Sequence, residues 1–216
     1  LFEEYGCTNL KVADVAAKDD AADPALAGVV RDAGGIWFAG GDQRRITEAL
    51  LDTAVGRAIL EAFVDGAVVG GTSAGTACQS SLMITGDGDF SLLTAENIEL
   101  WEGLGLFGGV IVDQHFVARK RHNRLISVVL EHPELLGVGV DEATAVWVRP
   151  DGTFEVLGDG WVVVYDASSA TVNRAAENRF GTPIGVHGLI THVLLPGDVY
   201  DVENRAVVGE PGEGGQ

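Results

Sequence analysis

The chain has 216 residues, of which 46% are hydrophobic, and its 32 acidic and 14 basic residues give a formal charge of −18. A surface this acidic repels phosphate backbones, which excludes a nucleic-acid-binding protein. No apolar run approaches the roughly 20 residues of a membrane-spanning helix, which excludes a protein anchored by one. We expect one globular domain over 1–216 with a sizeable core.

The first elements alternate between strands and helices. Asp23 and Pro24 are typical of a helix N-cap and first turn, and Gly34-Gly35 follows the predicted helix. The periodicity predicts a strand at 8–15, a helix at 23–31, a strand at 36–39, a helix at 47–63 and a strand at 67–69.

The second half becomes richer in strands. The periodicity predicts strands at 110–112, 136–140, 145–148, 153–156, 161–165, 188–195 and 206–208, and a helix at 124–131. Pro150-Asp151-Gly152 is a hairpin signal between two of these strands. The order predicts an α/β fold with a mostly parallel sheet and an antiparallel β extension toward the C-terminus.

Polar groups follow several of the predicted strands. They are 40–43, Ser73, 113–115 and Glu142. Functional sites of open α/β sheets lie beyond the carboxyl ends of the strands. We therefore expect these groups to meet in one site.

Three features bear on the cellular setting. The first residues lack the basic start and apolar stretch of a secretory signal, so we expect a cytoplasmic protein. The chain also begins without methionine, and we expect the true N-terminus to be missing. Abundant carboxylates with only three lysines are typical of salt-loving organisms, because high salt screens self-repulsion. Cys7 and Cys78 have no metal-type spacing, and we expect both to be buried apolar residues.

The stretch from Gly71 to Gly75 reads G-x-S-x-G. This pattern suits a sharp strand-to-helix turn that exposes the hydroxyl of Ser73, with the Ala74 amide as an oxyanion donor. A serine nucleophile needs a histidine base and an acid that orients it. Two orders remain open on spacing alone. One uses Ser73, His115 and Glu142; the other uses Ser73, then Asp113 or Asp141, then His187 or His192.

Five segments resemble the cyanophycinases, in a serine peptidase family that also includes aspartyl dipeptidase (dipeptidase E). They are IWFAGGDQRRI, GGTSAGTA, VDQHFVARKRHNRLI, LLGVGVDEATA and HVLLPGDVYDVE. The resemblance covers nearly the whole chain, from about residue 1 to residue 208. The family's serine, histidine and glutamate triad falls on Ser73, His115 and Glu142, although Asp141 stands beside Glu142 as an alternative acid.

The resemblance also implies an oxyanion hole and a substrate pocket. The amide of Gly41 in the GGDQ loop would join that of Ala74 at the oxyanion. The implied pocket residues are Gln43, Asp113, Gln114, Arg119, Arg121 and Arg124. Cyanophycin is poly-aspartate with arginine on its side branches, and guanidinium groups suit carboxylate recognition. These residues also have structural alternatives. Gln43 could cap a helix, Asp113 could be a structural acid, and the arginines could form a solvated helix face.

The family fold implies a three-layer sandwich similar to class I glutamine amidotransferases. It also implies a homodimer and no metal or organic cofactor. The family's first strand, glycine-rich turn and helix would precede residue 1 and are absent from this sequence. Thr76 stands where the family commonly has alanine, and we expect it to be tolerated.

The resemblance predicts a serine-type exopeptidase that cleaves cyanophycin to β-aspartyl-arginine dipeptides. Its partner is then a peptide or polymer rich in aspartate, with no nucleic acid and no membrane. Three alternatives remain: a dipeptidase E-like hydrolase of short aspartyl peptides, an esterase with the serine, acid, histidine order, and an inactive binding or assembly protein.

Overall fold

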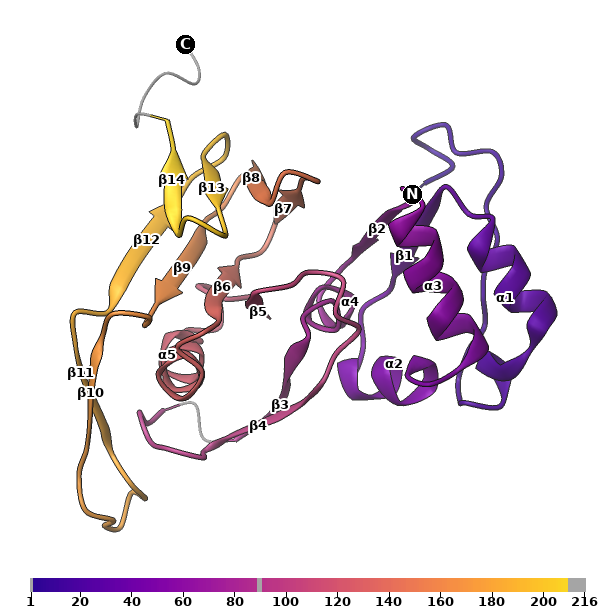
Figure 1. Cartoon of the computed structure of the whole chain (residues 1–216). Helices are drawn as coiled ribbons and strands as arrows, with labels where there is room; N and C mark the ends of the chain where they lie inside the picture. Colours follow the sequence, from indigo (N-terminus) through magenta and orange to yellow (C-terminus); the bar gives the residue numbers. More distant parts are fainter. Residues whose placement is uncertain (1, 89–90, 210–216) are drawn as a thin grey trace. The chain divides into compact units, whose positions relative to one another are not determined.

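The computed structural model describes residues 2–88 and 91–209, which form two compact units (Figure 1). The first unit contains the described residues up to Ile36 together with Arg45–Val69. The second contains Trp37–Arg44 together with the described residues from Gly70 onward. The single domain expected over 1–216 stays a prediction.

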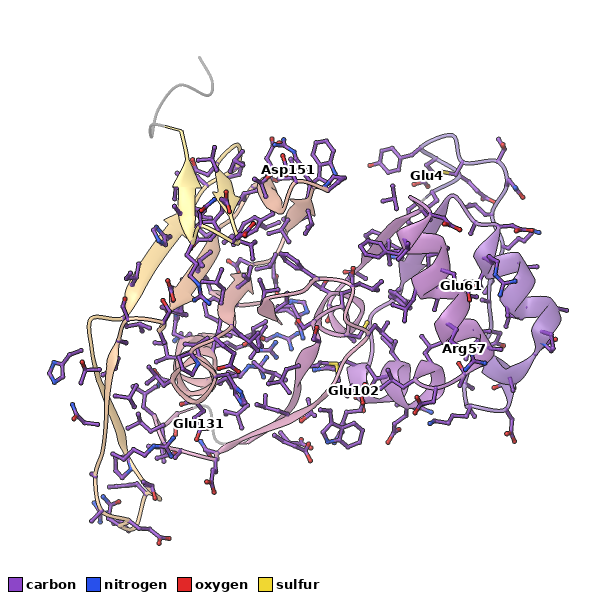
Figure 2. All side chains as sticks on the ribbon, viewed as in Figure 1. Glu4, Arg57, Glu61, Glu102, Glu131 and Asp151 are labelled. Atoms are coloured by element: carbon purple, nitrogen blue, oxygen red, sulfur yellow. The ribbon has the colours of Figure 1, made fainter. Side chains whose placement is uncertain are left out.

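The first unit is mainly helical. Its elements are a 3-10 turn (Asp20–Ala22), α1 (Pro24–Arg31), most of α2 (Gln43–Leu50) and α3 (Ala54–Val64). The predicted cap of α1 is confirmed, because the Asp23 side chain accepts a hydrogen bond from the Ala25 amide at 2.8 Å. Arg31 and Glu61 join α1 to α3 by an ion pair. Glu61 is labelled on α3 in Figure 2.

The single helix predicted over 47–63 is wrong, because the chain breaks between Leu50 and Ala54. Asp52 adopts a left-handed φ of 64°, which no α-helix accommodates. Thr53 then begins α3 by accepting a hydrogen bond from the Gly56 amide at 3.0 Å. A threonine cap followed by small residues was the available signal.

The strand predicted at 8–15 is also wrong. These residues form no regular element, and nearly all are exposed. Alternation makes a strand only where one face can be buried and a neighbour completes the hydrogen bonds. Cys7 is also exposed, so the expectation that it is buried is wrong. Cys78 is buried, as expected.

Two short strands flank the predicted turns of the site. β1 (Gly35–Phe38) and β2 (Val68–Gly71) pair with each other, and α4 (Ala74–Ala77) follows β2 closely. β3 (Leu82–Gly88) and β4 (Ile98–Glu102) form an antiparallel pair that the sequence did not reveal. A register shift between Ile84 and Gly88 interrupts its alternation.

A mixed four-stranded sheet forms the centre of the second unit. Its order is β12 (Ile190–Leu194), β9 (Val162–Asp166), β6 (Leu136–Val140) and β5 (Val110–Gln114). Only the β5–β6 pair in it is parallel; β9 and β12 are antiparallel to their neighbours. The α/β class is therefore confirmed, but these strands do not form a mostly parallel sheet. Every described element after α5 (His122–Glu131) is a strand, so hairpins rather than crossover helices make the connections.

A second sheet contains the predicted antiparallel extension. Its order is β14 (Ala206–Val208), β13 (Val199–Asp201), β8 (Thr153–Gly158) and β7 (Thr144–Val148), all antiparallel. Asp151 lies at the turn of the predicted β7–β8 hairpin, which is confirmed (Figure 2). A further hairpin pairs β10 (Thr171–Arg174) with β11 (Ile184–His187).

The mixed sheet is buried on both faces. Ile111, Val163 and Tyr165 pack on one side in a cluster with residues of α5. Val112, Val138 and Val164 pack on the other side against residues of β8 and β13. The unit thus stacks a helix, the mixed sheet and the second sheet, and the amidotransferase-like three-layer sandwich stays a prediction.

Two glycines in β6 let its neighbours approach closely. A Cβ at Gly137 would lie 2.7 Å from a side-chain carbon of Val129 in α5. A Cβ at Gly139 would lie 2.3 Å from the ring of Phe116. The main chain of β6 is therefore the surface on which α5 and Phe116 pack.

No helix in the described ranges is long and apolar enough to cross a membrane.

Candidate active site

The sharp turn that follows β2 presents the hydroxyl of Ser73. Ser73 adopts φ 55° and ψ −110°, a conformation that non-glycine residues rarely take. A Cβ at Gly71 would lie 2.2 Å from the carbonyl oxygen of Gly75, and one at Gly75 would lie 2.3 Å from that of Phe38. The two glycines therefore permit the close approach that G-x-S-x-G requires.

Thr76 strengthens this turn. Its hydroxyl donates to the carbonyl oxygen of Gly71 at 2.8 Å, which ties the first turn of α4 back to the end of β2. The sequence suggested only that threonine is small enough to be tolerated here.

Three side chains form a continuous chain of hydrogen bonds. The Oγ of Ser73 lies 3.0 Å from the Nε2 of His115. The Nδ1 of the same ring lies 3.0 Å from the Oε1 of Glu142. This is the spacing at which an imidazole can take a proton from a hydroxyl while a carboxylate orients the ring.

The neighbouring acids Asp141 and Glu142, between which the sequence did not decide, have different hydrogen-bond partners. Glu142 reaches His115, whereas the Oδ1 of Asp141 accepts a hydrogen bond from the Ala118 amide at 2.9 Å. Asp141 therefore holds the turn after His115, a contact that the sequence did not reveal. The carboxylate of Asp113, the other candidate acid, is bound by Arg124.

The serine, acid, histidine order has no geometric support in the described part of the chain. His187 is exposed at the end of β11, and the ring of His192 packs 5.3 Å from that of Tyr200. Ser73 is hydrogen-bonded to His115 instead.

The loop before α2 lies against the serine. A Cβ at Gly40 would lie 3.6 Å from the Cβ of Ser73. Gly41 adopts φ 138°, which favours glycine. Among the described residues, the amides of Gly41 and Ala74 have no hydrogen-bond acceptor. Both are thus able to donate to a bound group.

Gln43 is buried with its amide turned into the protein. Its Nε2 donates to the carbonyl oxygens of Ile84 and Thr85 at 2.8 and 2.9 Å. Next to it, Arg44 pairs with Asp42 and Asp87, and these carboxylates, Asp42 first, raise the pKa of the guanidinium. The hydrogen bonds of Gln43 and the Arg44–Asp87 ion pair attach the loop at 40–43 to β3.

The predicted arginines occupy three different environments. Arg119 is exposed, Arg121 is partly buried, and Arg124 is buried. Arg124 donates from Nε to the Oδ2 of Asp113 at 2.6 Å, and its Nη2 pairs with Oδ1. The Nη1 of Arg121 donates to the carbonyl oxygen of Gln114 at 2.7 Å, and the side chain of Gln114 lies 3.5 Å from the Oγ of Ser73.

The pKa of Arg121 is lowered, mainly by burial and then by the charge of Arg124, while Asp113 opposes the shift. A guanidinium in these surroundings remains charged but poorly hydrated. By contrast, burial raises the pKa of the Cys78 thiol to about 12, so this neighbour of the turn is a poor nucleophile.

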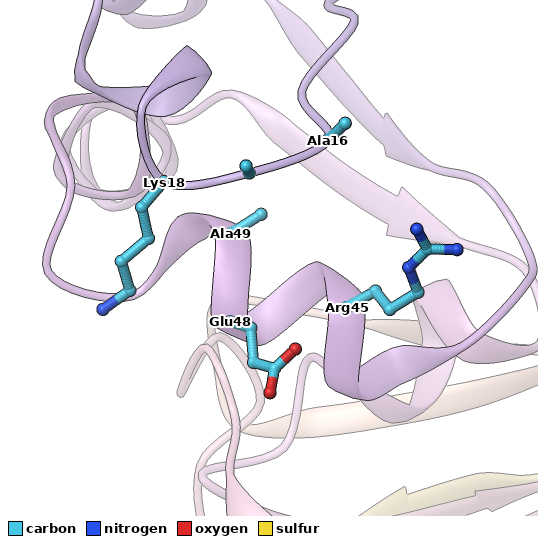
Figure 3. Close-up of a pocket in the computed structure, with 6 residues that line it drawn as sticks. Ala16, Lys18, Arg45, Glu48 and Ala49 are labelled. Atoms are coloured by element: carbon cyan, nitrogen blue, oxygen red, sulfur yellow. The ribbon is translucent and has the colours of Figure 1, made fainter.

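A separate pocket of about 250 Å³ lies in the first unit (Figure 3). Its lining is Ala16, Ala17, Lys18, Arg45, Glu48 and Ala49. The charged ends of Lys18 and Arg45 extend in opposite directions, so they do not converge on one ligand (Figure 3). Within the described ranges, no cluster of histidine, cysteine and carboxylate side chains is arranged to hold a metal ion.

The family model for peptidase family S51 matches residues 1–156. The chain belongs to this family. This S51 chain is 34% identical over 209 residues to a cyanophycinase of Trichormus variabilis, and the match covers 96% of the chain and 70% of that relative. It is 33% identical to a cyanophycinase of Thermosynechococcus vestitus, with 96% and 65% covered.

A solved structure is also similar to this S51 chain. It is the crystal structure of a peptidase from an acI-B1 Actinobacterium, with a TM-score of 0.59 and 28% sequence identity. The match covers 71% of this chain and 62% of that one. The chain thus spans about two thirds of the length of these relatives.

Proposed function

We propose that this chain is a serine-type peptidase that hydrolyses cyanophycin and releases β-aspartyl-arginine dipeptides. The observation that carries the proposal is the hydrogen-bonded chain from Ser73 through His115 to Glu142 at a G-x-S-x-G turn. Membership of peptidase family S51 and the similarity to cyanophycinases support the substrate class.

In the proposed mechanism, the Oγ of Ser73 attacks the carbonyl carbon of the peptide bond. The Nε2 of His115 takes the hydroxyl proton and then gives it to the leaving amine as the C–N bond breaks. The carboxylate of Glu142 accepts the hydrogen bond of the Nδ1 proton and stabilises the imidazolium. A water molecule, deprotonated by His115, then cleaves the acyl-serine ester.

The developing oxyanion needs preorganised donors. In the proposal these are the amides of Gly41 and Ala74, on the loop beside Ser73 and on the residue after it. Removing one such donor costs an enzyme of this type about 10²–10³ in kcat.

Arg119 and Arg121 are the proposed contacts for the aspartate carboxylates of the substrate. Arg119 is exposed. The Arg121 side chain is 13% exposed, and its Nη1 lies between the Gln114 carbonyl oxygen and, at 3.6 Å, the Oδ1 of Asp113; the side chain of Gln114 approaches Ser73. Permanently charged guanidinium groups bind carboxylates bidentately. Gln43 and Asp113 are engaged with Ile84, Thr85 and Arg124, so we assign them to shaping the pocket.

The deciding experiment incubates the purified protein with insoluble cyanophycin at low and high salt and identifies products by mass spectrometry. We expect β-aspartyl-arginine from the wild type and none from Ser73→Ala or His115→Ala. Cleavage of Asp-X dipeptides without release from cyanophycin would instead identify a dipeptidase E-like enzyme. A folded protein that cleaves neither substrate contradicts the proposed peptidase.

A homodimer, a cytoplasmic location and a high-salt optimum stay predictions from the resemblance and the composition. Light scattering coupled to gel filtration at low and high salt tests the first. The salt dependence of unfolding tests the last, since screening should stabilise a chain of charge −18.

A further inference from the structure

A buried ion pair closes the segment that carries His115. Asp113 is on β5 and Arg124 is in the first turn of α5, and each side chain is only 1% exposed. The two form a bidentate pair through Nε and Nη2. The chain between them contains His115, so the pair fixes both ends of this segment.

The first turn of α5 needs this partner. Its N-cap is Arg121, Arg124 follows three residues later, and it contains no acidic residue. Cations at a helix N-terminus oppose the helix dipole, and a buried unpaired charge is strongly unfavourable. The carboxylate of Asp113 supplies the missing negative charge from the adjacent strand.

The same carboxylate controls the backbone just before the catalytic base. The Oδ1 of Asp113 also accepts a hydrogen bond from the Gln114 amide at 2.8 Å. His115 then adopts a left-handed φ of 50°, which costs a non-glycine residue conformational energy. Such a conformation persists only where its surroundings impose it, and Phe116 and Ala118 provide further anchors.

We propose that Arg124 is a positioning residue that acts through Asp113 to hold His115 against Ser73, and that it does not contact the substrate. This inference rests on the proposed function only in taking His115 as the base. It separates the three arginines of this segment into two roles. Arg124 maintains the catalytic geometry. Arg119 is exposed, and Arg121, whose Nη1 also lies 3.6 Å from the Oδ1 of Asp113, is the other proposed substrate contact.

The test measures the second-order rate at which a small fluorophosphonate labels Ser73, because this probe has no aspartate for the arginines to bind. We expect Arg124→Gln to reduce the labelling rate about 10²-fold, the loss typical of a displacement near 1 Å. On a soluble cyanophycin fragment, kcat should fall while KM changes little. Labelling at the wild-type rate with a raised KM would make Arg124 a substrate ligand and overturn the proposal.

Two variants keep the test decisive if Arg124→Gln does not fold. Arg124→Lys keeps the charge but loses the bidentate contact, and we expect an intermediate labelling rate. The double variant Asp113→Asn with Arg124→Gln removes both charges and leaves a pair of amides able to bond to each other. We expect it to fold and to recover part of the rate. Wild-type labelling by folded Arg124→Lys contradicts a positioning role, and so does a folded double variant that labels more slowly than Arg124→Lys.

Arg205→Lys is the matched control. Arg205 pairs with Asp166 at 2.6 Å, and the Asp166 side chain is 4% exposed. Asp166 is on β9, which runs antiparallel to β6, so it lies at the end of the sheet opposite to the His115 segment. This variant should lose thermal stability and keep the wild-type labelling rate.

A proton NMR measurement separates this inference from the proposed function. The downfield signal of the His115 Nδ1 proton, identified by its loss in His115→Ala, reports the contact with Glu142 without any substrate. We expect this signal to shift or broaden in Arg124→Lys but not in Arg205→Lys. If the fluorophosphonate does not label Ser73 of the folded wild type, the proposed peptidase function is contradicted. If the His115 Nδ1 signal is unchanged in Arg124→Lys, only the positioning role is contradicted.

Discussion

The Oγ of Ser73 and the Nε2 of His115 lie 3.0 Å apart, and both residues have a positive φ, 55° and 50°. Each residue follows the end of a strand, Ser73 after β2 and His115 after β5. Left-handed conformations at two strand ends bring the two side chains together. Backbone conformation therefore sets the distance between proposed nucleophile and base.

The first prediction concerns this contact. We expect Ser73→Ala and His115→Ala each to lower kcat on cyanophycin by at least about 10³-fold, because the two groups act as one unit. The double variant should lose little more than either single variant. Additive losses, measured with freshly purified and folded proteins, would argue against a shared proton transfer.

The second prediction distinguishes the neighbouring acids Asp141 and Glu142. Glu142→Gln removes the charge that stabilises the imidazolium, and we expect kcat to fall by about 10²–10⁴-fold. Asp141→Asn keeps an oxygen that can accept from the Ala118 amide, so its loss should be much smaller. The reverse ranking in steady-state assays would assign the triad acid to Asp141.

The third prediction concerns the close approach at the turn. Gly75→Ala would place a Cβ 2.3 Å from the Phe38 carbonyl oxygen, so the turn must move. We expect a loss of about 1–3 kcal/mol in the free energy of unfolding, together with slower phosphonate labelling of Ser73. Gly108→Ala is the control, because a Cβ there meets nothing within 4 Å. Equal unfolding midpoints in urea for the two variants would refute this steric argument.

The fourth prediction is a dependence of stability on pH. Burial acts to raise the pKa of Asp166, but hydrogen bonds from Ser168 and Arg205 outweigh it and leave the pKa lowered. A carboxyl with a lowered folded-state pKa stabilises the fold above its unfolded pKa of about 3.9, and that stability is lost as the pH falls through the folded value. The free energy of unfolding should therefore decrease on acidification below about pH 4.

Asp166→Asn tests this assignment. It should reduce the slope of the unfolding free energy against pH below about pH 4, as measured by urea titration at several pH values. Asp159→Asn, at an exposed position, should leave the slope nearly unchanged. An identical slope in wild type and Asp166→Asn would remove Asp166 as a source of the acid sensitivity.

The sequence predicted the elements that carry strong local signals. The cap at Asp23, the strand Leu136–Val140 and the hairpin around Asp151 were all correct. Asp23 satisfies an amide of its own helix, and the hairpin turn joins neighbouring strands. Signals of this kind depend on few distant contacts.

Elements that depend on distant partners were predicted less well. The β3–β4 pair was missed because Gly86 and Gly88 interrupt its alternation. The direction of β9 relative to β6 was also missed, since the residues of a strand do not specify whether its neighbour is parallel. Both features are decided by pairing across the chain.

For the candidate site, the motifs identified the groups but not their surroundings. Nothing in the spacing of Asp113 and Arg124 indicates that both are buried together, because that depends on how α5 packs on β5 and β6. Likewise, the contact between Asp141 and the Ala118 amide appears only once the two loops lie side by side.

The close packing of Phe116 on Gly139 has an evolutionary consequence. The ring of Phe116 fills the space that a side chain at position 139 would need, because a Cβ at Gly139 would lie 2.3 Å from the ring. Neither position can change alone without displacing the residue that follows His115. Across members of family S51, the sizes of these two side chains should vary inversely, and a bulky residue on the strand should occur only with a small one after the histidine.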